Sequence, residues 1–358
     1  MLVQNFLENS AQHFPAKTAL ICGGQRLSYA QLDQQANRLA NALQAGGFGR
    51  GDRLVIYLPN SVEAVLGIFA TLKAGGTFVV VNHTTKADKL VYILNNCRAA
   101  ALLTNRRNEK LARDLGDQVP SLNFRIISGS PASGHKPEIS DESRNLAYLQ
   151  PLMESAPATQ PINVNIDLDL AGLIYTSGST GDPKGVMSDH SNVDFATSSI
   201  ISYLQNTPDD IVMNVLPLSF DYGLYQLLMV FKFGGTLVLE QSFTYPAAIL
   251  KRIEDEKVTG FPGVPTVFAI LVQMDLSTYD LSSLRYLTNT AAALPPSHIL
   301  QLRDKFPWAT LYSMYGLTET KRTLYLPPDQ LDIRPDSVGI AIPGTEVWLE
   351  DEAGQRLG

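Results

Sequence analysis

The sequence has 358 residues, 45% of them hydrophobic, and a formal net charge of −7 at pH 7. This length allows two or three compact units with ample core. The acidic balance, with no basic stripe, argues against a nucleic-acid surface. Two cysteines, Cys22 and Cys97, are too few for a disulfide framework and lack metal-ligand spacing.

The chain begins without a basic segment followed by a long apolar stretch, which is not the pattern of a secretory signal. No window holds 18 uninterrupted apolar residues, so no membrane-spanning helix is predicted. We therefore expect a cytoplasmic protein that has no membrane span and does not bind nucleic acid.

The first 150 residues alternate helical and strand patterns. Ser28, with Gln31 three residues later, forms a capping-box pattern that opens a helix, and the apolar stripe of this helix ends at Gly46. Asn60 is predicted to cap the next helix. The expected elements here are a strand over 54–58, a helix over 62–72, and strands over 78–81 and 101–103. Strands that alternate with helices indicate a parallel sheet with crossover connections.

Residues 130–165 are rich in Ser, Pro, Gly, Asn and Asp and lose the apolar spacing, which indicates a surface connection. An apolar run over 170–174 then predicts a buried strand. From residue 211 the alternation resumes, with strands over 211–216, 236–239, 259–261, 286–287 and 310–312, and helices over 222–231, 246–256, 266–274 and 296–306. Residues 347–354 resemble a strand that enters a hairpin turn.

The segment from Ile174 to Val186 carries the strongest functional signal. Hydroxyl side chains alternate with glycines, and a single lysine, Lys184, closes the run. Glycines allow several backbone N–H groups to point at one ligand, while hydroxyls and a lysine add donors and charge suited to phosphate oxygens. A flexible surface linker is the alternative, but a linker does not need the Pro-Lys-Gly closure. The spacing is not that of a Walker motif, so we expect binding by a loop and not by a helix N-terminus.

This run closely resembles the phosphate loop of the adenylate-forming superfamily, which comprises acyl-CoA synthetases, luciferases and the adenylation domains of nonribosomal peptide synthetases. Residues 27–32 and 36–40 are similar to the first core motif of that superfamily, and residues 72–79 to its second. The resemblance implies that the loop holds the β- and γ-phosphates of ATP while a carboxylate attacks the α-phosphorus.

The resemblance also implies the fold and the domain organisation. The expected fold class is α/β, with two βα-layered subdomains built on largely parallel sheets and the start of a small β-barrel. We expect an N-terminal α/β subdomain over 1–165, a second α/β subdomain with the phosphate loop and acyl pocket over 166–335, and the start of the barrel over 336–358. The C-terminal domain with the catalytic lysine of this superfamily is absent from the sequence, so weak or no turnover by this chain is expected.

The segment from Met314 to Thr320 follows a strand and is the second strong signal. A carboxylate beside a triphosphate is costly unless it holds a cation, and Mg²⁺ takes one or two carboxylates plus phosphate oxygens. By resemblance, Glu319 is the Mg²⁺ ligand, Thr318 contacts phosphate and Tyr315 packs on adenine. The alternative is a helix N-terminus in which Thr318 or Glu319 acts as a cap.

Three sets of site residues follow from the resemblance. The expected catalytic residues are Thr176, Lys184 and Glu319, the last also being the metal ligand. The expected nucleotide-binding residues are Thr176, Ser177, Gly178, Ser179, Thr180, Gly181, Lys184, Asn289, Thr290, Ala291, Tyr315, Gly316 and Thr318. The expected substrate-binding residues are Phe220, Asp221, Tyr222, Tyr225, Pro262, Thr288, Thr290, Met314, Arg322 and Thr323. The alanines over 291–293 depart from the glycines usual in the superfamily.

The pair Phe220-Asp221 bears on the substrate. Fatty acyl and aryl ligases often carry a histidine near this point, whereas amino-acid-activating domains carry Phe-Asp, whose carboxylate pairs with the ammonium of the substrate. The alternative is that Asp221 only caps a helix, which stabilises by ~1 kcal/mol. Arg322 adds a cation that would be costly to leave unpaired, so we expect it to meet Asp221, another carboxylate or a polar substrate.

Two other reactive-looking features carry less weight. His190 and Asn192 follow the phosphate loop, where a histidine in relatives orients the loop or begins a helix, and no second histidine or cysteine nearby suggests a metal. A Gly-x-Ser-x-Gly motif is absent, which argues against a serine hydrolase.

We therefore expect an AMP-forming acid–thiol ligase or adenylation domain. ATP and Mg²⁺ would activate a polar or amine-bearing carboxylic acid as an acyl-adenylate, with release of pyrophosphate. The acyl group would then pass to the phosphopantetheine thiol of coenzyme A or of an acyl or peptidyl carrier protein. A fatty or aryl acyl-CoA ligase and a noncatalytic nucleotide-binding module remain the alternatives.

Overall fold

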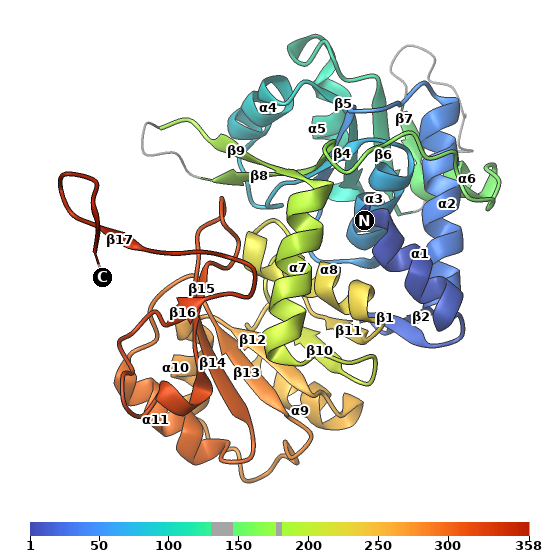
Figure 1. Ribbon diagram of the computed structural model, residues 1–358. Helices are drawn as coiled ribbons and strands as arrows, with labels where there is room; N and C mark the ends of the chain where they lie inside the picture. Colours follow the sequence, from blue (N-terminus) through green and yellow to red (C-terminus); the bar gives the residue numbers. More distant parts are fainter. Residues whose placement is uncertain (130–145, 177–180, 358) are drawn as a thin grey trace.

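The computed structural model describes residues 1–129, 146–176 and 181–357 and consists of two large sheets with helices packed around them (Figure 1). The α-helices are α1 (Gln4–His13), α2 (Tyr29–Ala45), α3 (Val62–Lys73), α4 (Ala87–Asn96), α5 (Glu109–Asp114), α6 (Leu149–Glu154), α7 (His190–Leu204), α8 (Asp221–Phe233), α9 (Pro246–Glu256), α10 (Pro265–Gln273) and α11 (Pro296–Lys305). Short 3₁₀ turns cover η1 (Arg106–Asn108), η2 (Gly116–Gln118) and η3 (Pro328–Gln330).

The first sheet has seven strands and is parallel apart from its last pair. Its strands lie in the spatial order β7 (Leu146–Tyr148), β6 (Phe124–Ser128), β5 (Ala99–Asn105), β3 (Arg53–Tyr57), β4 (Thr77–Val80), β8 (Leu170–Thr176) and β9 (Lys184–Asp189). Side chains alternate between the two faces. Leu54 and Ile56 join the main core on the side of α2 and α3, while Val55 and Tyr57 pack in a second core with α4 and α5.

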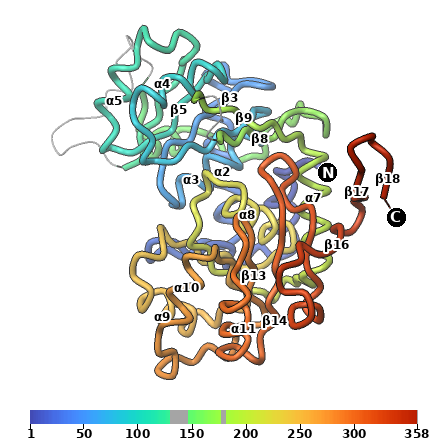
Figure 2. The backbone as a smooth tube through the Cα atoms, turned by 90° about the vertical axis from the view of Figure 1, so that its left-hand side faces the viewer, coloured from blue at the N-terminus to red at the C-terminus, as the bar shows by residue number. Residues whose placement is uncertain are grey.

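The second sheet has nine strands, and its central strands are parallel. Their spatial order is β16 (Ile340–Ala341), β15 (Leu324–Leu326), β14 (Thr310–Tyr315), β13 (Tyr286–Asn289), β12 (Gly260–Gly263), β10 (Ile211–Asn214), β11 (Thr236–Leu239), β1 (Thr18–Cys22) and β2 (Gln25–Ser28). Helices α9, α10 and α11 surround the end of the molecule that is remote from the seven-stranded sheet (Figure 2).

The sheets do not divide at the proposed boundary between residues 165 and 166. Strand β1 pairs with β11 in the nine-stranded sheet, and β8 pairs with β4 in the seven-stranded one. Each sheet therefore contains strands from both sides of that boundary. The division into 1–165, 166–335 and 336–358 stays a proposal.

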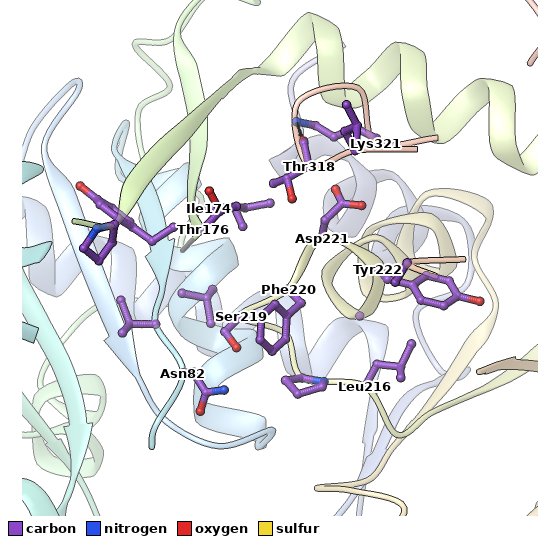
Figure 3. Close-up of a pocket in the computed structure, with 18 of the residues that line it drawn as sticks. Asn82, Ile174, Thr176, Leu216, Ser219, Phe220, Asp221, Tyr222, Thr318 and Lys321 are labelled. Carbon is purple, nitrogen blue, oxygen red and sulfur yellow. Dashed lines mark hydrogen bonds between the residues drawn. The ribbon is translucent and has the colours of Figure 1, made fainter. Parts of the chain in front are cut away.

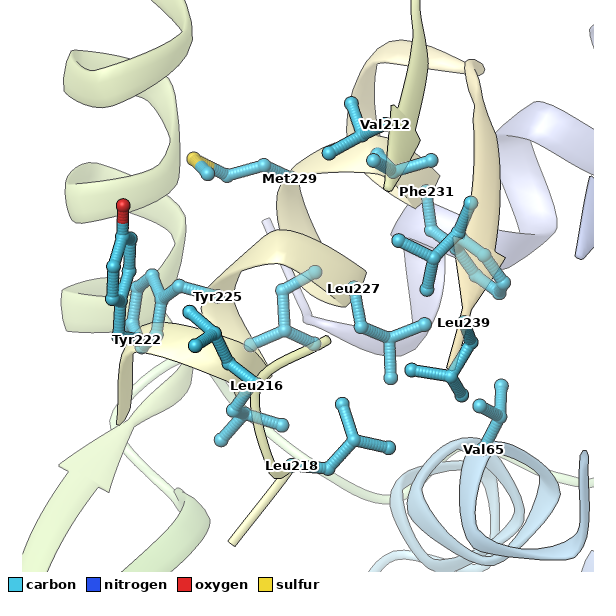
Figure 4. Close-up of a cluster of buried hydrophobic side chains, with 14 of the residues drawn as sticks. Val65, Val212, Leu216, Leu218, Tyr222, Tyr225, Leu227, Met229, Phe231 and Leu239 are labelled. Atoms are coloured by element: carbon cyan, nitrogen blue, oxygen red, sulfur yellow. The ribbon is translucent and has the colours of Figure 1, made fainter. Parts of the chain in front are cut away.

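Helices α3 and α8 lie between the two sheets and are apolar on almost every side. Every residue of α8 from Tyr222 to Phe231 is buried, as is every residue of α3 except Glu63. A helix that is hydrophobic all round belongs inside the protein. Phe69 of α3 stacks on Phe231 of α8 with ring centroids 5.2 Å apart, and Val65 lies beside Leu239 (Figure 4). One continuous core therefore joins the two sheets.

Most predicted elements are present within a few residues, including the capping box of Ser28 and Gln31 at the start of α2. The prediction for Asn60 was wrong, because Ser61 caps α3 and accepts from Ala64 N–H. The surface connection predicted over 130–165 was wrong in part, because β7 pairs with β6 and Leu149 and Met153 of α6 are buried. Residues 130–145 lie outside the described residues.

The last strands form a hairpin that projects from the rest of the molecule (Figure 2). Strand β17 (Leu349–Glu350) pairs antiparallel with β18 (Arg356–Leu357). This hairpin corresponds to the predicted hairpin turn near residue 354. Within the described residues, none of the helices combines the length and the apolar character needed to cross a membrane.

His190 is the first residue of α7, and its buried side chain contacts two other segments, at Val3 and at Asn165. Its side chain is fully buried, and its Nδ1 accepts a hydrogen bond from the Val3 N–H at 3.0 Å. Because Nδ1 accepts, the neutral tautomer carries its proton on Nε2. The Asn165 side-chain amide lies 3.3 Å from Nε2, and the orientation of this amide that agrees with the tautomer presents its oxygen as the acceptor. Burial lowers the pKa of the His190 imidazole from 6.5 to about 4, because the charged form is desolvated.

This shift predicts that stability falls as the solution is acidified from pH 6.5 towards pH 4. In that window the unfolded chain binds a proton that the folded protein rejects, and the loss levels off below the folded-state pKa. A shift of this size corresponds to about 3 kcal/mol of unfolding free energy. Urea unfolding from pH 7 to pH 4 should show a shallower pH dependence in His190→Gln than in the wild type. Equal slopes in the two proteins would mean that His190 is not the group responsible.

Candidate functional site

A cavity of about 820 Å³ lies between the two sheets (Figure 3). It opens where β4, β8, β10, β13 and β14 end, which is the edge at which open parallel sheets bind ligands. Its lining joins residues from both sheets: Val80, Val81, Asn82, Thr85, Lys89, Ile93, Ile174, Tyr175, Thr176, Pro183, Leu216, Pro217, Ser219, Phe220, Asp221, Tyr222, Gly223, Val264, Thr290, Ala291, Gly316, Leu317, Thr318, Lys321 and Arg322.

The ends of the predicted phosphate loop lie at this cavity. Thr176 ends β8 and is paired with Lys184, the first residue of β9, so the two ends of the loop are held side by side. The chain leaves the loop as a strand and not as a helix, as the closing Pro-Lys-Gly indicated. Thr176 lines the cavity and Lys184 is exposed to solvent. Gly181 has a φ of +103°, which favours glycine. Ser177, Gly178, Ser179 and Thr180 lie outside the described residues.

The segment predicted to hold adenine follows β13. Asn289 is buried and its Nδ2 donates to the Ala292 carbonyl at 3.1 Å, whereas its Oδ1 has no partner among the described residues. Thr290 and Ala291 line the cavity. Ala291 has a φ of +73°, a left-handed conformation that a side chain with a Cβ rarely adopts. The alanine that departs from the expected glycine therefore occupies a glycine conformation.

The segment after β14 winds into a turn that contains no helix, so the alternative of a helix N-terminus at Thr318 or Glu319 was wrong. Lys321 holds this turn together. It is 2% exposed with a φ of +61°, and its Nζ donates to the Thr318 carbonyl at 2.9 Å. A Cβ added to Gly316 would lie 2.1 Å from the Lys321 carbonyl oxygen, so only glycine fits there. Thr318, which this turn positions, faces the cavity (Figure 3).

The donors present fit a magnesium ion held mainly by phosphate. Glu319 is exposed, forms no ion pair with any of the described residues, and follows Thr318 at the edge of the cavity without lining it. Among the described residues no group of three or more His, Cys, Asp and Glu side chains could hold a metal by itself. Mg²⁺ keeps several waters and is bound through one or two carboxylates plus substrate phosphates, and one carboxylate at the edge of the cavity that the predicted phosphate loop adjoins agrees with that preference.

A buried ion pair lines the cavity beside the turn that carries Thr318 (Figure 3). Nη1 of Arg322, from the turn after β14, donates to Oδ2 of Asp221, the first residue of α8, at 2.7 Å. The two side chains are 2% and 12% exposed, respectively. The guanidinium carbon also lies 4.5 Å from the centroid of the Tyr222 ring, a favourable cation–π distance.

Asp221 does not cap α8, so that alternative was wrong: the N-cap residue is Phe220, and no side chain caps this helix. Burial raises the pKa of the Asp221 carboxyl, and the Arg322 guanidinium opposes this rise. Several polar atoms of the site have no partner among the described residues, namely Asp221 Oδ1, Arg322 Nε and Nη2, and the hydroxyl of Tyr225. Buried polar groups are normally hydrogen-bonded, so these atoms need a partner that the described residues do not supply.

The other predicted substrate-binding residues lie around this pair without all reaching the cavity. The Tyr222 hydroxyl bonds to the carbonyl and hydroxyl of Thr288, both at 2.7 Å. The Tyr203 hydroxyl donates to the sulfur of Met314. The predicted site residues that do not line the cavity are Gly181, Lys184, Tyr225, Pro262, Thr288, Asn289, Met314, Tyr315, Glu319 and Thr323.

The wall that the seven-stranded sheet contributes to the cavity was not predicted from the sequence. This wall follows β4 and includes Val81, Asn82 and Lys89. Its place beside the phosphate loop arises because β4 and β8 are neighbours, which no local pattern shows. Lys321 was not predicted either, although it precedes Arg322 and its charge would also be costly to bury without a partner.

A family model described as AMP-binding enzyme matches residues 7–358. A long-chain-fatty-acid–CoA ligase from Bacillus subtilis (strain 168) is 28% identical over 99% of this chain, which spans 66% of that ligase. A dimodular nonribosomal peptide synthase from the same organism is 29% identical over 98% of this chain, and the match covers 14% of its length.

Solved structures show the same fold. An anthranilate CoA ligase, AuaEII, in complex with anthranoyl-AMP aligns over 100% of this chain and 68% of its own, with a TM-score of 0.89 and 26% identity. VinN in complex with L-aspartate aligns over 96% of this chain and 83% of its own, with a TM-score of 0.80 and 30% identity.

The left-handed conformation of Ala291 predicts that Ala291→Gly stabilises the protein, by up to about 1 kcal/mol, because the relief of strain exceeds the entropy cost of glycine. Ala292→Gly is the matched control, since Ala292 is not among the residues with positive φ, and it should destabilise by about 0.5–1 kcal/mol. Thermal unfolding of both variants measures the difference. Equal destabilisation of the two would exclude strain at Ala291.

The buried pair predicts a marked loss of stability in Arg322→Met, about 3–5 kcal/mol, because Asp221 keeps a buried charge without a partner. The loss should shrink at lower pH, since the isolated carboxyl protonates. The double variant Asp221→Asn, Arg322→Met should recover much of it. Urea unfolding of the single and double variants at pH 5 and pH 8 tests both statements, and a double variant no more stable than Arg322→Met would contradict them.

Proposed function

The chain belongs to the AMP-binding enzyme family, and from that premise we propose that it activates a carboxylic acid with ATP, forming an acyl-adenylate and releasing pyrophosphate. One observation carries the proposal. A single cavity joins the end of the phosphate loop at Thr176, the turn at Thr318 and the ion pair of Asp221 and Arg322. A nucleotide and an acid bound there would meet at one place, and holding two reactants in contact is itself a large part of catalysis.

The residues assigned to the nucleotide would act through their charge and their position. Lys184 and the loop hydroxyls would bind the β- and γ-phosphates, and Thr318 would contact phosphate from the opposite side. Glu319 would hold Mg²⁺, which supplies neutralisation of the phosphate charge when bound. Asn289, Thr290 and Ala291 would lie along adenine, with Tyr315 packed against it.

The residues assigned to the carboxylic acid substrate favour one that bears an amine. Oδ1 of Asp221 has no partner among the described residues, while Oδ2 is occupied by Arg322. An ammonium group could bind Oδ1 without breaking the ion pair. The free Nε and Nη2 of Arg322 suit an additional anionic group of the same substrate. VinN, a structural neighbour, has been solved with L-aspartate, an amino acid with two carboxylates, and this supports an amino acid substrate here.

The alternative is a fatty or aryl acyl-CoA ligase, the activity named for the Bacillus subtilis ligase and for AuaEII. The apolar side chains of the cavity, among them Ile93, Leu216 and Val264, are the observation that favours it. In either case the acceptor would be the phosphopantetheine thiol of coenzyme A or of a carrier protein. A noncatalytic nucleotide-binding module is a further alternative, to be distinguished by whether pyrophosphate is formed.

Replacement of Lys184 by alanine tests the residues assigned to the nucleotide. The variant should lose about 100-fold or more of acid-dependent ATP–pyrophosphate exchange, because a charge on the leaving phosphates is removed. Lys110→Ala, at an exposed lysine of α5 outside the cavity, is the control and should leave exchange unchanged. Calorimetry with a non-hydrolysable Mg-ATP analogue gives a second readout. Unchanged affinity and exchange in Lys184→Ala would contradict the assignment.

The residues assigned to the acid are tested with pairs of acids that differ in one group. Aspartate against succinate isolates the amine, aspartate against β-alanine isolates the second carboxylate, and hexanoate represents a plain fatty acid. We expect aspartate to be preferred over succinate, β-alanine and hexanoate, and Asp221→Asn to reduce kcat/KM for aspartate by about 10-fold or more, since a charged hydrogen bond is lost. If plain hydrocarbon acids exceed every amine-bearing acid in the exchange assay, the role given to Asp221 is wrong.

A further inference from the structure

Asn60 is a buried polar side chain that links the two sheets below the cavity. It follows β3 of the seven-stranded sheet and is 5% exposed. Its Nδ2 donates to the Leu216 carbonyl at 3.0 Å and to the Glu240 carbonyl at 2.8 Å, and its Oδ1 accepts from the Leu218 N–H at 2.9 Å. The side chain thus makes three hydrogen bonds to segments that follow β10 and β11 of the other sheet. None of them supports its own helix, which Ser61 caps.

These bonds hold the segment that leads to Asp221. Leu216 and Pro217 line the cavity, and Ser219, Phe220 and Asp221 follow them in the lining. In the described part of the chain, the hydrogen bonds from Asn60 are the ones that connect residues 215–221 to the seven-stranded sheet and its helices.

The segment is bound to the end of β10 and to the first turn of α8, so a displacement at its contacts with Asn60 would reach Asp221. The Asn214 side chain accepts from the Leu216 N–H and donates to the Gly223 carbonyl, both at 3.1 Å. A Cβ added to Gly223 would lie 2.4 Å from the Pro217 carbonyl oxygen, so the first turn of α8 is packed on the backbone of the segment. A shift at Leu216 would therefore be transmitted to Asp221 and not absorbed on the way.

The two walls of the cavity come from different sheets. One wall includes Val81, Asn82 and Thr176, and the other includes Phe220 and Asp221. The apolar contacts between α3 and α8 hold the sheets together but are not directional. Hydrogen bonds fix distance and angle, and those of Asn60 lie at the base of the wall that carries Asp221.

We propose that Asn60 is a positioning residue that sets where the acid-binding wall stands relative to the phosphate loop. This inference rests on the proposed function for its consequence, since the wall is assigned to the acid. It predicts that altering Asn60 weakens the use of the acid while leaving nucleotide binding intact. Loss of correct spacing between reactants is costly, because a misplacement of about 1 Å can lower a rate 100-fold.

Asn60→Asp tests the proposal with almost no change in shape. Aspartate retains an acceptor for the Leu218 N–H, but its carboxylate cannot donate to the carbonyls of Leu216 and Glu240. Asn60→Ser, which is too short to span the gap, is a second variant. Asn37→Asp is the matched control, because Asn37 is 4% exposed and its Nδ2 donates to the Ala158 carbonyl at 3.1 Å, away from the cavity.

The first readout does not depend on activity. Amide hydrogen exchange over residues 216–224 should be about 10-fold faster or more in both Asn60 variants, because local opening becomes easier. Asn37→Asp should leave these residues unchanged even if its overall stability falls. Unchanged exchange over 216–224 in the Asn60 variants would overturn the proposal.

The second readout compares the effect of the Asn60 variants on the acid with their effect on the nucleotide. The KM for the preferred acid should rise about 10-fold in the Asn60 variants, while the affinity for a non-hydrolysable Mg-ATP analogue stays within about twofold of the wild type. Equal losses for acid and nucleotide would overturn the proposal. If the wild type uses no acid, the proposed function fails by itself, and the exchange measurement still decides whether Asn60 anchors the wall.

Discussion

A buried guanidinium is costly unless it pairs with a carboxylate. The segments around this cavity are arranged so that Arg322 has such a partner. Arg322 comes from the turn after β14 and Asp221 from the start of α8, and their 2.7 Å contact brings together segments 101 residues apart in sequence. Taking two charges out of water costs several kcal/mol per ion unless their geometry is good. Arg322 adds the face of Tyr222 to that geometry. Among the described residues, one carboxylate oxygen and two guanidinium nitrogens of the pair have no partner, and these are the atoms that the proposed function assigns to substrate recognition.

The rest of the site depends on how the sheets present their strand ends. Parallel strands bring the loops that follow them to one edge, and here two such edges face each other across a shared core. Helices α3 and α8 fill the space between the sheets, with Phe69 stacked on Phe231. Apolar packing of this kind holds the sheets together, while polar contacts such as those of Asn60 define their relative position. The turn that carries Thr318 is fixed in a comparable way by Lys321 and by the close approach of Gly316.

Features that depend on neighbouring residues could be predicted from the sequence, and the pairing of segments far apart in the chain could not. The capping box at Ser28 and the apolar strands act over a few residues, so their patterns predicted structure correctly. Arg322 was marked as a costly charge, and its partner proved to be Asp221, one of the partners considered. The order of strands cannot be read in this way. It places β1 beside β11 and β4 beside β8, and it brings Asn82 to the cavity. Asn60 was misread for the same reason, because its hydrogen-bond partners lie more than 150 positions along the chain.

In the proposed function, Oδ1 of Asp221 binds the amine of the acid while Arg322 stays on Oδ2. The most direct measurement is a crystal structure of the protein with a non-hydrolysable aminoacyl sulfamoyl adenosine. We predict the amine within hydrogen-bonding distance of Asp221 Oδ1, with the Arg322 contact at Oδ2 retained and the sulfamoyl group beside Thr176 and Thr318. An amine directed away from Asp221, or an acyl group bound outside the cavity, would contradict the account.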